Sequence, residues 1–304
     1  MLQSKATPSG DEPHSSETNA ESANDRISKQ EAASNMPSEI RSKACSIEVE
    51  DAVLEYPVGP YRRGSLKSSL MSLVGFREQQ HKFDFVTALK GVSFDINHGE
   101  RVGVVGRNGS GKSTLLRALA GVYPMRSGSI TIHGDIGTLL DISLGFELES
   151  TGRENIYNRG MSMGYSRKEL EAVEDEIIRF TDIGNFIDLP MRTYSTGMCV
   201  RLGFAISTQF IPDILLIDEV FGAGDGIFAN RALDRMNAVV ESSGIVVLVS
   251  HDMNAVKMIC NRVLWIDDGE VKMDGPTDDV LAAFSDFVLG ISRNEIPYFM
   301  PLRG

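Results

Sequence analysis

The sequence has 304 residues, 42% of them hydrophobic, and carries a formal net charge of −12. Because affinity for phosphate backbones comes from clustered Lys and Arg, this acidic balance argues against a general nucleic-acid-binding protein. We expect neither a membrane span nor a secretory leader, since no apolar run approaches the roughly 20 residues of a span and no apolar segment follows a basic start.

The three cysteines, Cys45, Cys199 and Cys260, lack metal-ligand spacing. We interpret them as reduced packing thiols, which fits a cytosolic compartment.

The first 44 residues are rich in Ser, Glu, Asn and Ala and hold almost no large apolar side chains. Such a segment buries too little surface to offset its ordering entropy, which predicts a disordered extension over 1–44. From Ser46 the stretch "SIEVEDAVLEY" alternates like a strand, so we expect one folded domain over 45–288 and a tail over 289–304.

Within this domain, segment 60–80 has a helical apolar stripe with basic residues nearby. The stripe consists of Leu66, Leu70, Leu73 and Val74. One interpretation is a short helix packed on its own domain, and the other is a face presented to lipid headgroups or to a membrane-embedded partner. The sequence leaves both open.

The motif "GRNGSGKST" follows the apolar strand "RVGVV" and opens a helix, as a phosphate-binding loop requires. Glycines let successive backbone N–H groups point at one anion, and the helix N-terminus adds its dipole. Lys112 would reach the outer phosphates, Ser113 would supply a Mg²⁺ ligand, and Thr114 would contact an inner phosphate. The alternative is a structural Gly-rich turn. The expected loop is Gly106, Arg107, Asn108, Gly109, Ser110, Gly111, Lys112, Ser113 and Thr114.

A helical region is expected over about 150–205, where an apolar stripe opposes many carboxylates. Beyond it, buried strands alternate with helices up to a hairpin at "RVLWIDDGEVKMDG". This alternation predicts an α/β fold with a mostly parallel, helix-covered sheet.

Two later strands end in polar residues that suit phosphate chemistry. "ILLIDE" stops at Asp218, a candidate Mg²⁺ ligand, and Glu219, which would polarise the attacking water. "VLVSHD" ends with His251, which would contact the γ-phosphate. Taken alone, neither motif indicates catalysis, since acidic pairs are common in loops and a lone His is more often structural.

Together, the phosphate loop, "YSTGM", "ILLIDE", "GAGD" and the strand-terminal histidine occur in the order that nucleotide-binding domains of ABC transporters show. The resemblance covers about residues 46–285. "TGRENIYNRG", "FIDLPMRTYSTGMCVRLGFA" and "DEVFGAGD" further resemble ATP-binding subunits that export O-antigen, capsular polysaccharide and teichoic acid. The resemblance implies an ABC-type domain with a mostly parallel core sheet, an antiparallel β subdomain and a helical subdomain.

The resemblance also implies roles for single residues. Ser195, Thr196 and Gly197 would form the signature loop, which in this family binds ATP held by the other subunit of a dimer. Asp225 would lie in the loop that crosses the dimer interface, and His251 would be the switch histidine. Asp141 stands where the superfamily usually has Gln, and would contact Mg²⁺ and water.

An aromatic side chain is expected to stack on adenine. We take Phe85 as the first candidate, Phe83 as the second and Tyr56 as the third. Each could equally be a core aromatic.

The function implied is that of the ATPase subunit of a bacterial exporter of lipid-linked polysaccharide, using ATP and Mg²⁺. It would form a homodimer, bind an integral-membrane permease at the cytoplasmic face of the inner membrane and use segment 60–80 as a gate. Export of teichoic acid or another undecaprenyl-linked polymer is the alternative, and a soluble non-transport ABC ATPase is a third. Only about 30 residues follow the hairpin, so we expect no C-terminal glycan-binding β-sandwich in this sequence.

Overall fold

The computed structural model describes residues 45–58, 84–140, 145–218 and 226–290. The chain divides into two units, Met1–Lys43 and Ala44–Gly304, and every described residue belongs to the second. The predicted N-terminal extension, the amphipathic segment 60–80 and most of the predicted C-terminal tail lie outside the described residues.

A three-stranded antiparallel sheet in the order β2-β1-β4 comprises β1 (Ser46–Val58), β2 (Asp84–Asn97) and β4 (Ser127–His133). In β1 the buried side chains change parity, from Ile47 and Val49 to Ala52 and Leu54. The register shifts between Val49 and Ala52, and such an irregularity is what lets both halves of a strand bury their apolar side chains on one face.

The second sheet has six strands in the order β5-β6-β7-β3-β8-β9. The first five are parallel to one another, and only β9 is antiparallel, to β8. The strands are β3 (Arg101–Val105), β5 (Ile136–Leu139), β6 (Ile214–Asp218), β7 (Ile245–Val249), β8 (Arg262–Asp267) and β9 (Glu270–Pro276). This confirms the predicted α/β class, the mostly parallel sheet and the C-terminal hairpin.

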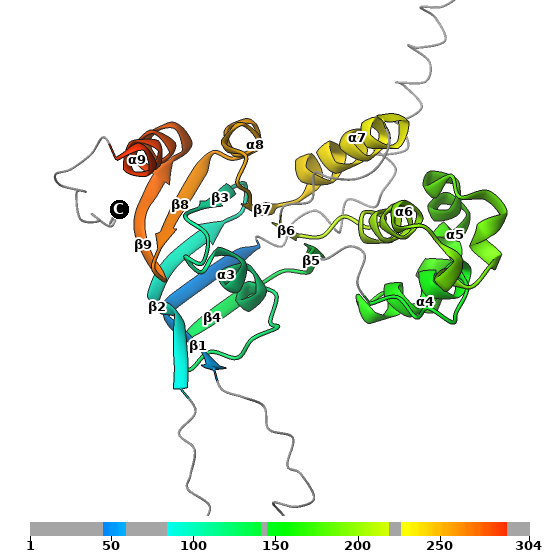
Figure 1. Ribbon diagram of the computed structural model, residues 1–304, viewed down its shortest axis with the longest axis horizontal. Helices are drawn as coiled ribbons and strands as arrows, with labels where there is room; N and C mark the ends of the chain where they lie inside the picture. Colours follow the sequence, from blue (N-terminus) through cyan, green and yellow to red (C-terminus); the bar gives the residue numbers. More distant parts are fainter. Residues whose placement is uncertain (1–44, 59–83, 141–144, 219–225, 291–304) are drawn as a thin grey trace, which may run out of the picture. The chain divides into compact units, whose positions relative to one another are not determined.

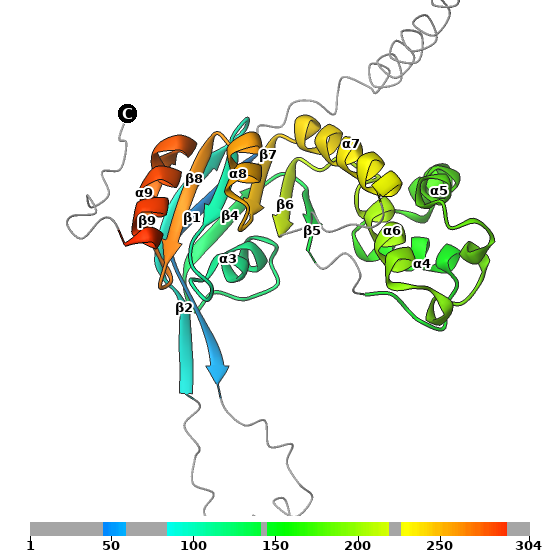
Figure 2. The same cartoon turned by 45° about the horizontal axis from the view of Figure 1, so that its top comes forward.

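Helices cover both faces of this sheet (Figures 1 and 2). Along β7, Ile245 and Val247 face the core that includes α3, whereas Val246 and Leu248 face the core that includes α7, α8 and α9. Alternate side chains of a strand point to opposite faces, so a fully apolar strand belongs between two helical layers. The helices are α3 (Lys112–Leu119), α7 (Gly226–Ser242), α8 (Met253–Ile259) and α9 (Thr277–Leu289).

The predicted helical subdomain contains α4 (Gly152–Ser162), α5 (Arg167–Thr181), two short 3₁₀ helices η2 (Gly184–Asp188) and η3 (Met191–Thr193), and α6 (Thr196–Ser207). Capping boxes start two of these helices, with Thr151 and Glu154 at α4 and Ser166 and Glu169 at α5. Each box satisfies two backbone N–H groups that the helix leaves unpaired. The subdomain has its own core, which includes Ile156, Ile177, Ile187, Leu202 and Ile206.

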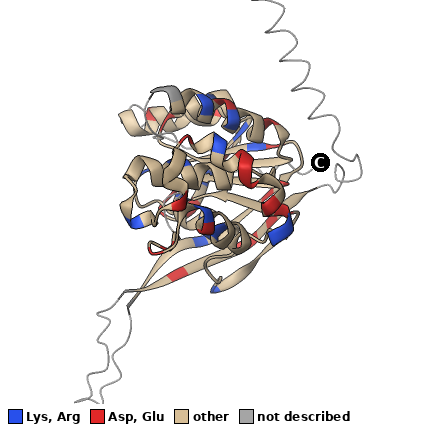
Figure 3. Ribbon diagram, turned by 90° about the vertical axis from the view of Figure 1, so that its right-hand side faces the viewer, with Lys and Arg blue, Asp and Glu red and all other residues tan. Residues whose placement is uncertain are grey.

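Within the described ranges, no helix combines the length and the apolar character that crossing a membrane requires. Lys and Arg are interspersed with Asp and Glu along the ribbon (Figure 3), and many of them pair with one another.

Candidate functional site

The carboxyl ends of three neighbouring parallel strands meet at one edge of the larger sheet. Strand register places Asp218 of β6 opposite Val249 of β7, and Val249 opposite Val104 of β3. Gly106 and His251 each lie two residues beyond this row. The hydrogen-bond ladder therefore brings the phosphate loop, Asp218 and His251 to one place, although 145 residues of sequence separate Gly106 from His251 (251 − 106).

The phosphate loop runs from the end of β3 into α3 and folds around the side chain of Lys112. The Lys112 ammonium donates to the carbonyl oxygens of Gly106 at 2.8 Å and Arg107 at 3.0 Å. Only 6% of Lys112 is exposed, so its charge is directed into the loop. The Ser110 N–H donates to the Arg107 carbonyl oxygen at 3.1 Å and closes the turn.

The loop has the properties of an anion-binding site. The α3 N-terminus receives no hydrogen bond from a capping side chain, because its N-cap is Gly111 in the left-handed conformation. The Ser110 hydroxyl is buried and has no hydrogen-bond partner among the residues that the structure describes. Uncapped N–H groups, a buried ammonium and an unsatisfied hydroxyl together fit a phosphate group, which supplies several acceptor oxygens.

These groups surround a pocket of about 520 Å³. Of the predicted site residues, those that line it are Asn108, Gly109, Ser110, Gly111, Lys112, Ser113, Thr114, Asp218 and His251. Gly106 and Arg107 form the base of the loop without lining the pocket. A side chain at Gly106 would not fit, since its Cβ would lie 2.0 Å from the Ile266 carbonyl oxygen.

Ser113 and Asp218 lie in the same pocket and offer hydroxyl and carboxylate oxygens, the ligands that Mg²⁺ prefers. Mg²⁺ usually combines one or two protein ligands with phosphate oxygens and water rather than a full protein cage. No cluster of three or more metal-ligating His, Cys, Asp or Glu side chains occurs among the described residues, and this site does not require one. The donor set fits a phosphate-bound Mg²⁺.

Four predicted site residues lie outside the described residues: Phe83, Asp141, Glu219 and Asp225. Their predicted roles stay predictions.

Phe85, the first candidate for adenine stacking, is 55% exposed and does not line the pocket, whereas Tyr56 and Val86 do. Strand pairing explains the difference, because Tyr56 pairs with Val86 and Phe85 pairs with Pro57. Adjacent residues of a strand point to opposite faces, so Phe85 and Val86 do not share one. The Tyr56 hydroxyl also donates to the Thr114 hydroxyl at 3.1 Å, within the phosphate loop. Tyr56 therefore becomes the better-placed aromatic candidate.

The turn between β8 and β9 contributes residues that the sequence did not assign to the site. Asp268 and Gly269 line the pocket, and the Gly269 N–H donates to the Ser110 carbonyl oxygen at 2.9 Å. Both have positive φ, 49° and 78°, which is typical of the two-residue turns that an Asp-Gly pair favours. The dipeptide could have signalled the turn, but nothing local signals its contact with a loop some 160 residues earlier.

The predicted signature residues, Ser195, Thr196 and Gly197, do not line this pocket. They are exposed at the start of α6, where the Ser195 hydroxyl accepts a hydrogen bond from the Met198 N–H at 3.3 Å. Among the described atoms, the nearest to a Cβ added at Gly197 would be the Ser195 hydroxyl oxygen, at 3.9 Å. The start of α6 is therefore open on its outer side.

Residues 89–222 match the family model described as "ABC transporter". The O-antigen export system ATP-binding protein RfbB of Myxococcus xanthus is 41% identical, over 74% of this chain and 51% of that protein. RfbE of Yersinia enterocolitica, which carries the same description, is 39% identical over 74% of this chain and 95% of that protein.

The teichoic acids export ATP-binding protein TagH of Enterococcus faecalis is 39% identical, over 77% of this chain and 51% of that protein. The chain thus spans about half the length of RfbB and TagH, and nearly all of RfbE. Among solved structures, a dimeric ATP-binding cassette with ADP and Pi aligns with a TM-score of 0.57 at 20% identity, covering 76% of this chain and 98% of that one. At this identity the likeness shows the fold alone.

Proposed function

Because this chain belongs to the ABC transporter family of ATP-binding proteins, we propose that it hydrolyses ATP to drive export of a lipid-linked cell-surface polysaccharide. One observation carries the chemistry: Lys112, Asp218 and His251 line a single pocket at the ends of three adjacent strands. The polymer class is supported by RfbB and RfbE, both named as O-antigen export proteins.

In this proposal, Lys112 and the backbone N–H groups of the phosphate loop hold the phosphates. Ser113 and Asp218 would hold Mg²⁺, which neutralises phosphate charge when it is bound. Glu219 would orient and polarise the attacking water, and His251 would contact the γ-phosphate. Fixed positive groups aimed at the developing charge would supply most of the rate enhancement.

The proposal includes a second copy of the chain. Ser195, Thr196 and Gly197 lie on the open outer side of α6 and outside their own pocket, which supports contact with ATP held by a partner. Asp225 would lie at that interface. The dimer would bind an integral-membrane permease at the cytoplasmic face of the inner membrane, with Asp141 near the region of contact.

The nucleotide part is tested with the full chain and its Glu219→Gln variant. The variant should bind MgATP, fail to hydrolyse it and elute as a dimer during size-exclusion chromatography with light scattering. Gly197→Asp should bind nucleotide as the wild type does but neither dimerise nor hydrolyse. A monomeric Glu219→Gln protein with unchanged hydrolysis would refute the assignment.

Teichoic acid export is the second candidate, because TagH is nearly as similar to this chain as RfbE is. Both candidates use the same nucleotide chemistry. Replacing the chromosomal gene with a Lys112→Ala allele distinguishes them through the surface polymer that is lost. Loss of an O-antigen or capsule supports the first candidate, and loss of wall teichoic acid supports the second.

A further inference from the structure

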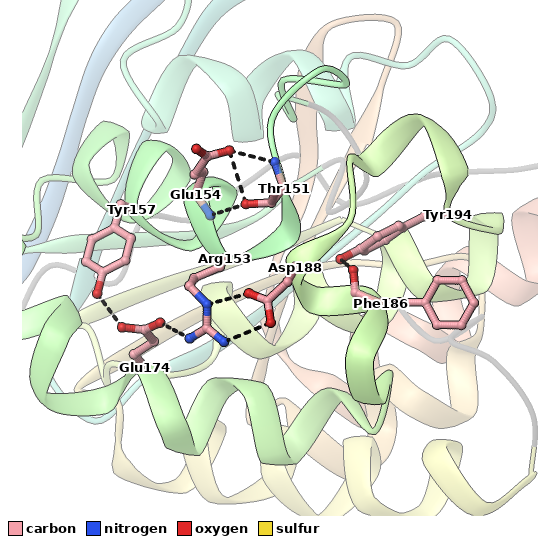
Figure 4. Close-up of polar contacts among 8 residues, drawn as sticks. All are labelled: Thr151, Arg153, Glu154, Tyr157, Glu174, Phe186, Asp188 and Tyr194. Carbon is pink, nitrogen blue, oxygen red and sulfur yellow. Dashed lines mark hydrogen bonds and ion pairs between the residues drawn. The ribbon is translucent and has the colours of Figure 1, made fainter.

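Tyr194, the residue before Ser195, turns its side chain back into the helical subdomain. Its hydroxyl donates to the Phe186 carbonyl oxygen at 2.7 Å, while the Phe186 ring points away (Figure 4). The phenol lies over Gly152, where an added Cβ would come within 2.1 Å of the Tyr194 hydroxyl oxygen and 3.0 Å of Ile187. Tyr194 can occupy this position only because residue 152 has no side chain.

The two residues that receive Tyr194 are themselves held in place. Arg153, next to Gly152, forms ion pairs with Glu174 of α5 and with Asp188 of η2, the latter at 2.7 Å. These contacts fix the first turn of α4 and the η2 segment that contains Phe186 relative to α5.

The backbone leading into Tyr194 is tied to the same region. The Met191 N–H donates to the Ser150 carbonyl oxygen at 2.9 Å, and the Arg192 N–H donates to that of Leu148 at 3.0 Å. These bonds fix the chain up to the residues just before Tyr194. Between Arg192 and α6, the Tyr194 side chain makes a hydrogen bond back to the Phe186 backbone. The Ser195 side chain instead bonds forward, to the Met198 N–H of α6.

Burial raises the pKa of Tyr194 to about 12, against an opposing effect of the Gly152 backbone. The hydroxyl therefore keeps its proton, and its donor role, throughout the physiological pH range. By contrast, Ser195 directly after it is exposed, and its hydroxyl accepts a hydrogen bond from the Met198 N–H within α6.

We propose that Tyr194 is a positioning residue that holds Ser195, Thr196 and Gly197 where they meet the nucleotide of a second subunit. Tyr194 touches no nucleotide in its own subunit, since it does not line the pocket. The inference rests on the proposed function, because only a dimer gives these residues a phosphate to bind. A small displacement of the signature loop would lower the hydrolysis rate without changing the subunit's own nucleotide pocket.

The test compares Tyr194→Phe with Tyr157→Phe in the full chain. Both variants lose one phenolic hydroxyl that hydrogen-bonds within the helical subdomain, but Tyr157 bonds to Glu174 and not near the signature loop. Tyr194→Phe should lower kcat about five-fold, the effect of one ordinary hydrogen bond. It should leave the calorimetric Kd for ATP within about two-fold of wild type. Tyr157→Phe should keep wild-type kcat.

A double-mutant cycle adds a second readout. Gly152→Ala should lower kcat more than Tyr194→Phe does, because its Cβ collides with the Tyr194 hydroxyl. Gly152→Ala combined with Tyr194→Phe should recover part of the activity, because the 2.1 Å contact with the hydroxyl oxygen is gone while the contacts with Ile187 at 3.0 Å and the aromatic ring at 3.1 Å remain. If Tyr194 only stabilised the fold, kcat would instead fall in step with Tm across the three variants of the cycle.

The inference is overturned if Tyr194→Phe matches Tyr157→Phe in kcat, or if the double variant is no more active than Gly152→Ala. It is also overturned if kcat falls only in step with Tm. If the wild type does not hydrolyse ATP and the Glu219→Gln variant does not dimerise with MgATP, the proposed function itself fails. The two failures are therefore distinguishable.

Discussion

The Lys112 ammonium lies 2.8 Å from the carbonyl oxygen of Gly106, at the opposite end of the phosphate loop. The side chain thus closes the loop on itself, with a second bond to Arg107 at 3.0 Å. A buried ammonium that donates to loop carbonyls can also donate to a phosphate oxygen, and hydrogen bonds between two charged groups are about twice as strong as neutral ones. The folded loop is therefore poised for phosphate.

Lys112→Ala should weaken ATP binding by about 10- to 100-fold, since a hydrogen bond to a charged group contributes about 1.5–3 kcal/mol. Isothermal titration calorimetry with MgATP measures this directly. Lys257→Ala is the control, because Lys257 is an exposed cation paired with Asp278 on α9. Equal ATP affinity for the two variants would exclude the loop as the phosphate site.

Gly269→Ala should weaken nucleotide binding through the β8–β9 turn. Its Cβ would lie 2.8 Å from the Ala88 carbonyl oxygen, so the turn must shift and disturb the hydrogen bond to Ser110. Gly91→Ala is a matched control, because Gly91 has nearly the same φ (80° against 78°) but open space around it.

In both glycine variants the free energy of unfolding in urea should fall by about 1–2 kcal/mol, because alanine is strained in the left-handed conformation. Only Gly269→Ala should also raise the Kd for ATP. Unchanged ATP affinity in Gly269→Ala would show that the turn does not brace the loop.

Acid should weaken the helical subdomain through Glu174. Burial acts to raise the pKa of Glu174, but hydrogen bonds from Tyr157 and Arg153 outweigh burial and hold the pKa below its usual 4.5. A depressed folded-state pKa contributes stability above the unfolded-state value and loses it as pH falls through the folded-state value.

The urea midpoint of the wild type should therefore exceed that of Glu174→Gln at neutral pH, and the difference should shrink below about pH 4.5. Glu171→Gln is the control, since Glu171 forms an exposed i,i+4 pair with Arg167 on the same helix. A wild-type advantage over Glu174→Gln that stays constant with pH would contradict this account.

Local patterns in the sequence predicted much of the fold and the centre of the site. The apolar run of β7 predicts a strand covered by helices on both faces, and "GRNGSGKST" after β3 predicts a phosphate loop. Both predictions succeed from sequence because each structure is formed by residues that are consecutive in the chain. Asp218 and His251 are also predictable, because each comes at the end of an apolar strand and parallel strands bring such ends together.

What the sequence could not provide depends on strand register and distant contacts. The sequence ranks Phe85 before Tyr56 for adenine stacking, whereas the strand register places Tyr56 beside the pocket. The irregularities of β1 that set this register have no local pattern in the sequence. The contact of Gly269 with Ser110 and the packing of Tyr194 over Gly152 join residues far apart in the chain. Each requires the folded arrangement.

The ladder of β6, β7 and β3 has a consequence for robustness. A single strand, β7, separates the strand that ends at Asp218 from the strand that leads into the phosphate loop. Strand spacing sets their separation at roughly 10 Å, twice the distance between hydrogen-bonded strands. Backbone geometry therefore sets the distance between Asp218, the proposed Mg²⁺ ligand, and the phosphate loop. Conservative substitutions within β7, such as Val247→Ile, should alter packing but leave the distance between Asp218 and the phosphate loop unchanged.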